Sequence, residues 1–160
     1  MKKLTFRSYS ANDTVAFANK LARTLHKGDV VGLFGDLGSG KTTFVKGLAA
    51  GLGLKTKINS PSFVILKVYC RGAKRKDIHL YHFDLYRLKS LKELEDIGYE
   101  DFINSDAICV IEWADKAKSL LPKEYLRINI RIKGENKRAM NIISCGTVYD
   151  GLINRLRIEK

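Results

Sequence analysis

The chain of 160 residues has few cysteines and no long apolar run. Its three cysteines, Cys70, Cys109 and Cys145, are widely spaced and form no Cys-x-x-Cys pair. Such a set argues against a disulfide framework or a zinc site, and it favours a reduced, cytoplasmic compartment. No stretch approaches the ~18 consecutive apolar residues of a membrane span. No apolar run follows Lys2 and Lys3, so we expect no signal peptide.

Proline is also scarce, with two residues, and the chain has no repeat, low-complexity segment or linker. We therefore expect a single domain over residues 1–160. Acidic residues number 17 against 29 lysines and arginines, which gives a net charge of +12. Such a surface attracts polyanions: nucleic acid, nucleotides or an acidic protein. The alternative is that these basic side chains only cover solvated faces and bind no partner. The densest runs of basic residues, 71–76 and 133–138, fall in predicted turns.

Apolar periodicity and turn residues predict alternating strands and helices in the first half of the chain. We expect an edge strand, two buried strands and two hairpins. We also expect four helices and a short helix from Ser90. Alternation of this kind is typical of an α/β fold with a mainly parallel central sheet, to which the hairpins add antiparallel strands. The predicted strands cover 4–9, 30–34, 63–70, 78–85, 107–111, 126–133 and 139–144, and the four longer helices cover 14–25, 41–52, 114–121 and 148–156.

Residues 35–42, Gly-Asp-Leu-Gly-Ser-Gly-Lys-Thr, satisfy the P-loop pattern G-x-x-x-x-G-K-[ST]. The motif follows a predicted buried strand and precedes a predicted helix, as the chemistry requires. Glycines let successive backbone N–H groups point at one anion, and the helix N-terminus adds further donors. We expect the phosphates of a nucleotide to contact Asp36, Leu37, Gly38, Ser39, Gly40, Lys41, Thr42 and Thr43.

Within this motif, Lys41 supplies a point charge for the β- and γ-phosphates, and the Thr42 hydroxyl is placed to ligate Mg²⁺. Two acidic residues end apolar runs and are candidates to complete the site. Glu112 has a Walker-B-like position at the carboxyl end of a strand, where ligands of α/β sheets bind. Asp84 could hold Mg²⁺ through water or orient the attacking water, and a helix cap or a salt bridge with Arg87 is the alternative.

The nucleotide is expected to be ATP, because the chain lacks the Asn-Lys-x-Asp that GTP-binding relatives use for guanine. Asn12 and Thr14 are weak candidates for contact with the base. The Ser-Pro-Ser at 60–62 either senses the γ-phosphate as a switch or forms a rigid loop.

Two histidines and the tryptophan lie close in sequence to these candidates. We interpret His79 and His82 as structural residues of a strand. Trp113 packs either near the nucleotide or in the core.

Several of these segments together resemble the TsaE family, the bacterial P-loop ATPases of tRNA threonylcarbamoyladenosine synthesis. They are the P-loop with Thr43 and Phe44, Ser-Pro-Ser-Phe at 60–63, His-Phe-Asp-Leu-Tyr-Arg-Leu at 82–88, Glu-Leu-Glu at 93–95 and Ile-Glu-Trp at 111–113. The resemblance runs in order from about residue 14 to residue 146. It implies a P-loop nucleoside triphosphate hydrolase fold that binds ATP and Mg²⁺.

The resemblance also implies roles for individual residues. Lys41 and the loop amides bind the ATP phosphates, Thr42 and Glu112 ligate Mg²⁺, and Asp84 assists hydrolysis. The family's usual threonine is Ser62 here, and its frequent proline after Glu-Trp is Ala114. Arg138 lies where the family carries an arginine in its late hairpin, which makes it a candidate contact for phosphate or a partner.

In this family the transfer to tRNA is catalysed by a partner pair, TsaD and TsaB. The resemblance therefore implies an accessory ATPase, slow in isolation, that drives turnover of that pair. The net charge of +12 fits either a tRNA contact through the basic surface or an acidic partner. Two alternatives remain at this point. One is a small-molecule or nucleoside kinase. Such a kinase normally closes an arginine-bearing lid over the phosphates, and the basic turn at 71–76 lies in a predicted hairpin and not in a helical lid. The other is a nucleotide-gated binding module, against which Glu112 and Asp84 argue.

Overall fold

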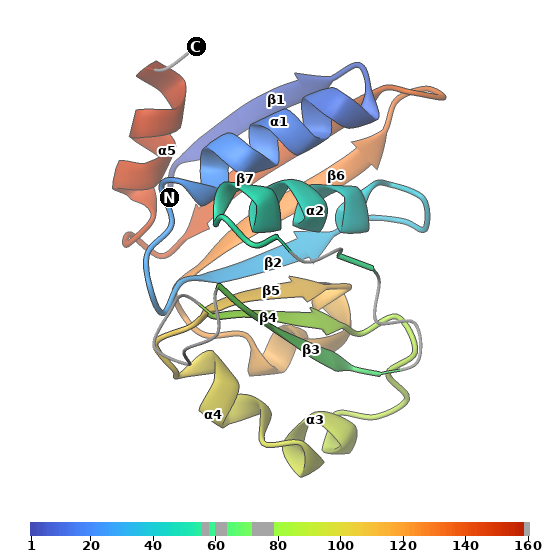
Figure 1. Cartoon of the computed structure of the whole chain (residues 1–160), viewed down its shortest axis with the longest axis vertical. Coiled ribbons are helices and arrows are strands. Elements are labelled where there is room, and N and C mark those ends of the chain that lie inside the picture. Colours follow the sequence, from blue (N-terminus) through green and yellow to red (C-terminus); the bar gives the residue numbers. More distant parts are fainter. Residues whose placement is uncertain (56–57, 60–63, 72–78, 159–160) are drawn as a thin grey trace.

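A seven-stranded mixed sheet forms the centre of the molecule (Figure 1). The structure is a computed structural model that describes residues 1–55, 58–59, 64–71 and 79–158. The strands are β1 (Lys3–Ser8), β2 (Val30–Phe34), β3 (Leu66–Cys70), β4 (His79–Asp84), β5 (Ile108–Glu112), β6 (Tyr125–Ile132) and β7 (Arg138–Cys145). The helices are α1 (Ala11–Ala22), α2 (Lys41–Gly51), α3 (Lys92–Asp96), α4 (Tyr99–Ile103), α5 (Asp150–Ile158) and the 3₁₀ segment η1 (Ala114–Leu120).

The strand order is β1-β7-β6-β2-β5-β4-β3. The four inner strands, β6, β2, β5 and β4, are parallel to their neighbours in this group. The hairpins β3–β4 and β6–β7 and the edge strand β1 add the antiparallel pairings. This arrangement confirms the predicted α/β fold with a mainly parallel centre, both hairpins and the edge strand.

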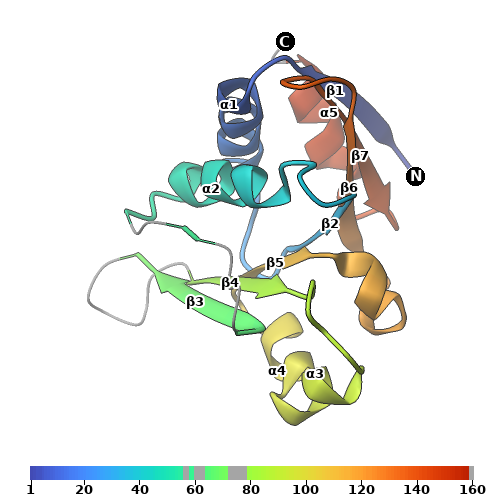
Figure 2. The same cartoon turned by 90° about the vertical axis from the view of Figure 1, so that its right-hand side faces the viewer.

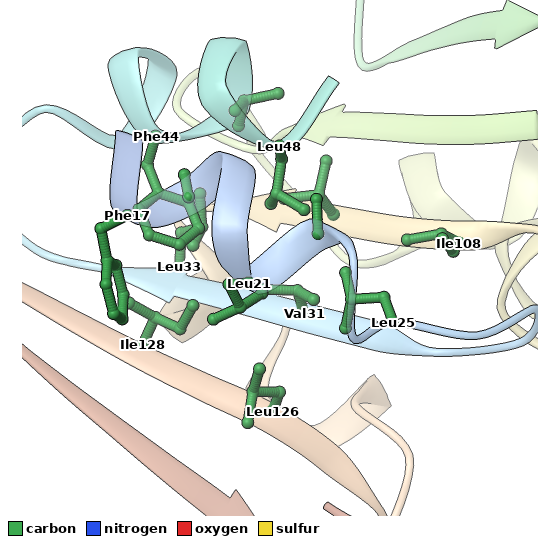
Figure 3. Packing of buried hydrophobic residues seen from close by; sticks show 14 of the residues in the cluster. Phe17, Leu21, Leu25, Val31, Leu33, Phe44, Leu48, Ile108, Leu126 and Ile128 are labelled. Atoms are coloured by element: carbon green, nitrogen blue, oxygen red, sulfur yellow. The ribbon is translucent and has the colours of Figure 1, made fainter. Parts of the chain in front are cut away.

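Helices cover the two faces of the sheet unequally (Figures 1 and 2). One face packs against α1 and α2 through an apolar cluster, in which side chains of both helices point toward β2, β5 and β6 (Figure 3). The other face is covered at the β4–β5 end, where Leu94, Tyr99 and Ala114 join a second cluster. Both faces of β2 and β5 are therefore buried, which explains their continuous apolar sequences.

The two helices of the first layer approach each other closely because α2 carries glycines where it faces α1. A Cβ at Gly47 would lie 2.4 Å from the carbonyl oxygen of Val15 and 2.7 Å from the Cβ of Ala18. A Cβ at Gly51 would lie 2.4 Å from the carbonyl oxygen of Asn19. This packing fixes the position of α2, and with it the P-loop that precedes α2.

Some elements differ from the sequence-based expectation. The short helix expected from Ser90 is α3, and a further helix, α4, follows Gly98, which has a left-handed conformation (φ 72°). Ile97, which follows the last turn of α3, is 38% exposed. The helix expected over 114–121 is a 3₁₀ segment with a kink at Ala117. None of the helices in the described part of the chain has the length and apolar character needed to cross a membrane.

Candidate active site

The P-loop connects β2 to α2 at the carboxyl end of the parallel strands. Gly35 starts the loop with φ 147°, and a Cβ there would lie 2.3 Å from the carbonyl oxygen of Ile130 on β6. Gly40 precedes α2 in a left-handed conformation (φ 100°). Glycine is required at both positions, since a side chain would clash at Gly35 and strain the backbone at Gly40. The N-terminus of α2 therefore faces the loop, as an anion site requires.

Lys41 is buried at the start of α2, with 4% of its surface exposed. Its Nζ donates hydrogen bonds to the carbonyl oxygens of Gly35 at 2.8 Å and Asp36 at 2.9 Å. The same ammonium lies 3.7 Å from the ring centroid of Trp113, which is a cation–π contact. Burial lowers the pKa of Lys41, and the negative charge of Glu112 is the largest influence that opposes this shift.

Glu112 ends β5 beside the P-loop, and its side chain is almost fully buried at 2% exposure. The Thr42 hydroxyl donates to its carboxylate, with Oγ1 2.9 Å from Oε2 and 3.1 Å from Oε1. Asp84 ends β4 in register with Glu112, so both carboxylates reach the same edge of the sheet. An oxygen of Asp84 accepts a hydrogen bond from the backbone N–H of Tyr86 at 3.0 Å. The two predicted carboxylates thus lie in one site with Lys41 and Thr42.

His82 is a site residue that the sequence reasoning placed in a purely structural role. Its ring is fully buried, and its Nε2 lies 2.8 Å from Oε1 of Glu112. Since a carboxylate accepts, Nε2 carries the proton and donates. The signal was present in the sequence, because His82 precedes Asp84 by two residues and successive alternate residues of a strand share a face. What the sequence did not show was that β4 lies next to β5.

These side chains line an open cleft of about 700 Å³. Trp113 forms part of its wall and packs against Tyr86, with ring centroids 5.1 Å apart. Among the described residues, Trp113 is the single non-glycine residue with a positive φ, 59°. The indole lines the cleft beside Lys41 and also packs against the second apolar cluster. The remaining lining residues are Leu37, Gly38, Gly40, Thr42, Thr43, Val64, Ile65, Asp84, Arg87, Glu93 and Glu112.

A smaller pocket of about 80 Å³ adjoins the P-loop on the side of α1. Thr14, one of the two residues considered for base contact, lines it with Gly40 and Thr43. The Thr14 Oγ1 lies 2.8 Å from the Oγ of Ser8. Asn12, the other candidate, is exposed on α1 and lines neither of these two cavities.

Arg138 connects the β6–β7 hairpin to the P-loop. Its Nε donates to the carbonyl oxygen of Ser39 at 3.0 Å and its Nη2 to that of Gly38 at 3.1 Å. Its Nη1 donates to three carbonyl oxygens of the hairpin turn, those of Gly134, Glu135 and Lys137. The guanidinium thus holds the loop backbone in place, a role that the sequence did not reveal.

Two predicted features fall outside the described residues: the switch at 60–62 and the basic turn after Arg71. Within the described ranges, no group of three or more His, Cys, Asp and Glu side chains is arranged to hold a metal ion. A magnesium ion would instead take one carboxylate and one hydroxyl from the chain. Glu112 and Thr42 provide this donor set, and Mg²⁺ commonly combines such ligands with water and substrate phosphates.

Three comparisons with known proteins agree on one family. The profile of TsaE, described as threonylcarbamoyl adenosine biosynthesis protein TsaE, matches residues 8–140. The tRNA threonylcarbamoyladenosine biosynthesis protein TsaE of Bacillus subtilis is 39% identical over 98% of this chain and 95% of its own length. That of Treponema pallidum is 41% identical over 84% of this chain and 96% of its own length.

The fold agrees with a solved structure of the same kind. The crystal structure of Bacillus subtilis YdiB superposes with a TM-score of 0.83 at 34% identity, covering 99% of this chain and 96% of that one. The match therefore includes the strands and helices that place Lys41, Glu112 and Asp84. With a family profile over most of the chain and curated relatives near 40% identity, the protein belongs to the TsaE family of tRNA threonylcarbamoyladenosine biosynthesis.

Proposed function

We propose that the chain is an ATP-binding and ATP-hydrolysing accessory subunit of the tRNA threonylcarbamoyladenosine machinery, and that it works in the cytoplasm. In this proposal its Mg²⁺-dependent hydrolysis drives turnover of the TsaD–TsaB pair, which performs the modification. The observation that carries the proposal is the contact between the Thr42 hydroxyl and the buried Glu112 carboxylate at the P-loop. This contact supports the proposal because P-loop hydrolases hold Mg²⁺ with the hydroxyl of the P-loop Ser or Thr and an acid at the end of a neighbouring strand.

The P-loop supplies the phosphate site through its backbone N–H groups and the N-terminus of α2. The Lys41 ammonium is held by two loop carbonyls and the Trp113 ring. To contact phosphate, the Lys41 ammonium exchanges the loop carbonyls and the Trp113 ring for negatively charged phosphate oxygens. This exchange is favourable because charge-assisted hydrogen bonds are stronger than bonds to neutral carbonyls.

Glu112 and Thr42 are the residues that would hold Mg²⁺ in this site. When bound, the ion neutralises charge on the phosphate oxygens and orients them for displacement. The hydrogen bond from His82 fixes the orientation of the Glu112 carboxylate before any ligand arrives.

Asp84 is the group proposed to orient the attacking water or to bind the metal through water. Its backbone position in register with Glu112 brings it to the same side of the cleft. The bond from the Tyr86 N–H holds one oxygen of this carboxylate in place. Slow hydrolysis by the isolated chain is expected, because P-loop enzymes often receive a catalytic charge from a partner.

The test is ATP hydrolysis by purified wild-type chain, Lys41→Ala and Glu112→Ala, each measured with Mg²⁺ and with EDTA. We expect Mg²⁺-dependent hydrolysis in the wild type and none above background in either variant. Wild-type turnover in either folded variant would contradict the site assignment. Transfer of phosphate to a small acceptor in place of water would indicate the kinase alternative.

A further inference from the structure

The second face of β1, β7 and β6 is open. Residues of these strands that point toward α1, such as Leu4, Ile128 and Met140, are buried in the first core cluster. The alternate residues point the other way. Tyr125 and Cys145, at one end of this face, join the second core cluster with Ala114 and Ala117 of η1, and no helix in the described part of the chain covers the remainder (Figure 2). The C-terminal helix α5 does not cover this face either, because Leu152 and Ile153 pack into the first cluster.

This open face is basic and carries no acid. The three strands contain five lysines and arginines and no aspartate or glutamate. The nearest acids in sequence, Glu124 and Glu135, lie outside the strands, and Glu124 accepts hydrogen bonds from the N–H groups of Thr147 and Val148. We call the following residues the basic sheet face: Lys3, Thr5, Arg7, Arg127, Asn129, Arg131 and Asn141.

The strand register arranges four cations around a polar centre. Arg7 and Arg131 both pair with Ala139, and Lys3 and Arg127 both pair with Ile143. Neighbouring strands lie about 4.8 Å apart, so each pair of cations is separated by about 10 Å across the strands. The two pairs are offset by four positions along the strands, which corresponds to about 13 Å. The result is a flat rectangle with a positive charge near each corner.

A row of hydrogen-bonding side chains crosses the middle of the rectangle. Thr5 and Asn129 both pair with Asn141. The Thr5 hydroxyl donates to Oδ1 of Asn141 at 3.0 Å, and Nε of Arg127 donates to Oδ1 of Asn129 at 3.0 Å. With both amide oxygens engaged inside the protein, the asparagines present N–H donors. Arg127 is further held over the ring of Phe34, 4.2 Å from its centroid.

We propose that the basic sheet face binds the phosphate backbone of a folded RNA. Four cations without an anion, together with amide donors, complement phosphate and ribose oxygens. An acidic protein is a poorer match, because protein interfaces centre on large apolar or aromatic anchors, and the apolar residues between these cations are only Ala139 and the half-buried Ile143. Single-stranded RNA is also a poorer match, because it is bound by stacking bases on aromatic side chains. Double-helical RNA is recognised through its shape, phosphates and 2′-hydroxyls.

The identity of the RNA as tRNA rests on the proposed function, and the binding itself does not. The experiment measures binding of an unmodified tRNA transcript by fluorescence anisotropy over a series of salt concentrations. The test variant is Arg7→Gln/Arg131→Gln, in which both altered residues are exposed and lie outside the cleft. The matched control is Arg23→Gln/Lys92→Gln, which removes the same charge from exposed residues on α1's end and α3.

Each phosphate contact contributes about 0.7–0.9 to the slope of log K against log salt. We therefore expect the test variant to reduce the slope by about 1.4–1.8 and to weaken binding about 5- to 25-fold at 0.1 M salt, with little change in the control. Both variants should keep the wild-type melting temperature and ATPase rate.

Three outcomes would overturn the proposal. Wild-type chain that fails to bind tRNA at 0.1 M salt is the first, and equal losses in the test and control variants are the second. The third is competition by polyglutamate for the chain that is as strong as competition by unlabelled tRNA of equal charge, which would indicate an acidic protein partner. Failure of TsaD–TsaB to stimulate hydrolysis would instead refute the proposed function and leave the RNA measurement unaffected.

Discussion

The hydrogen bond between His82 and Glu112 allows a quantitative prediction. Replacement of His82 by leucine removes the donor 2.8 Å from Oε1 while keeping an apolar side chain of similar size. Hydrogen bonds to charged groups contribute about 1.5–3 kcal/mol, and the Glu112 carboxylate, 2% exposed, has little water to replace the donor. We expect His82→Leu to lower the free energy of unfolding by about 2–3 kcal/mol.

In a domain of this size, 1 kcal/mol corresponds to about 2–4 °C, so the melting temperature should fall by about 4–12 °C. The assay is thermal unfolding followed by circular dichroism, without nucleotide. His82→Gln is the conservative control, because the glutamine amide keeps an N–H donor. Its melting temperature should fall by less than half as much as that of His82→Leu.

A double-mutant cycle with Glu112→Met separates the bond from general packing, because methionine has a similar size and no carboxylate oxygen to accept the bond. If the bond carries the effect, the loss caused by His82→Leu should shrink by at least 1 kcal/mol in the Glu112→Met background, within the range of coupling between contacting residues. The same loss in both backgrounds, or an unchanged melting temperature in His82→Leu, would refute the reasoning.

Three further predictions concern packing, the buried thiol and the loop. Gly47→Ala should destabilise the chain by about 1–3 kcal/mol in urea unfolding despite the better helix propensity of alanine, since its Cβ overlaps α1. Burial raises the pKa of Cys109 to about 12 and keeps it protonated, so a thiol reagent at pH 8 should modify exposed Cys70 in the native chain and Cys109 only after unfolding. Arg138→Ala should weaken ATP binding about tenfold in a titration, because two P-loop carbonyls lose their donors; unchanged affinity would contradict a loop-ordering role.

The parts of the site that could be predicted from sequence depend on local chemistry. The P-loop follows from a contiguous motif, and its position follows from the apolar strand before it. Glu112 and Asp84 could be predicted because each ends an apolar run, and parallel strands end at one edge of a sheet. Cys109 lies within the apolar run that precedes Glu112, and it is fully buried.

The parts that could not be predicted depend on contacts between distant segments. The role of His82 requires the pairing of β4 with β5, and that of Arg138 requires the hairpin turn to reach the P-loop from 99 residues away in sequence. The pattern Ser-x-x-Glu at 90–93, typical of a helix N-terminus, predicted α3 but gave no sign of α4. The left-handed Gly98 separates the two helices.

The open basic face was likewise hidden in the sequence. The net charge of +12 predicted attraction to polyanions but not where they would bind. The register of three strands, two of them far from β1 in sequence, brings Lys3, Arg7, Arg127 and Arg131 together.

The central claim is that this chain is a partner-driven ATPase, and one measurement tests it most directly. Mg²⁺-dependent ATP hydrolysis is measured for the chain alone and with the TsaD–TsaB pair of the same organism, with Lys41→Ala as the blank. The account predicts slow hydrolysis alone, strong stimulation by the pair and no activity in Lys41→Ala. Folded, ATP-binding chain that the pair does not stimulate would contradict it.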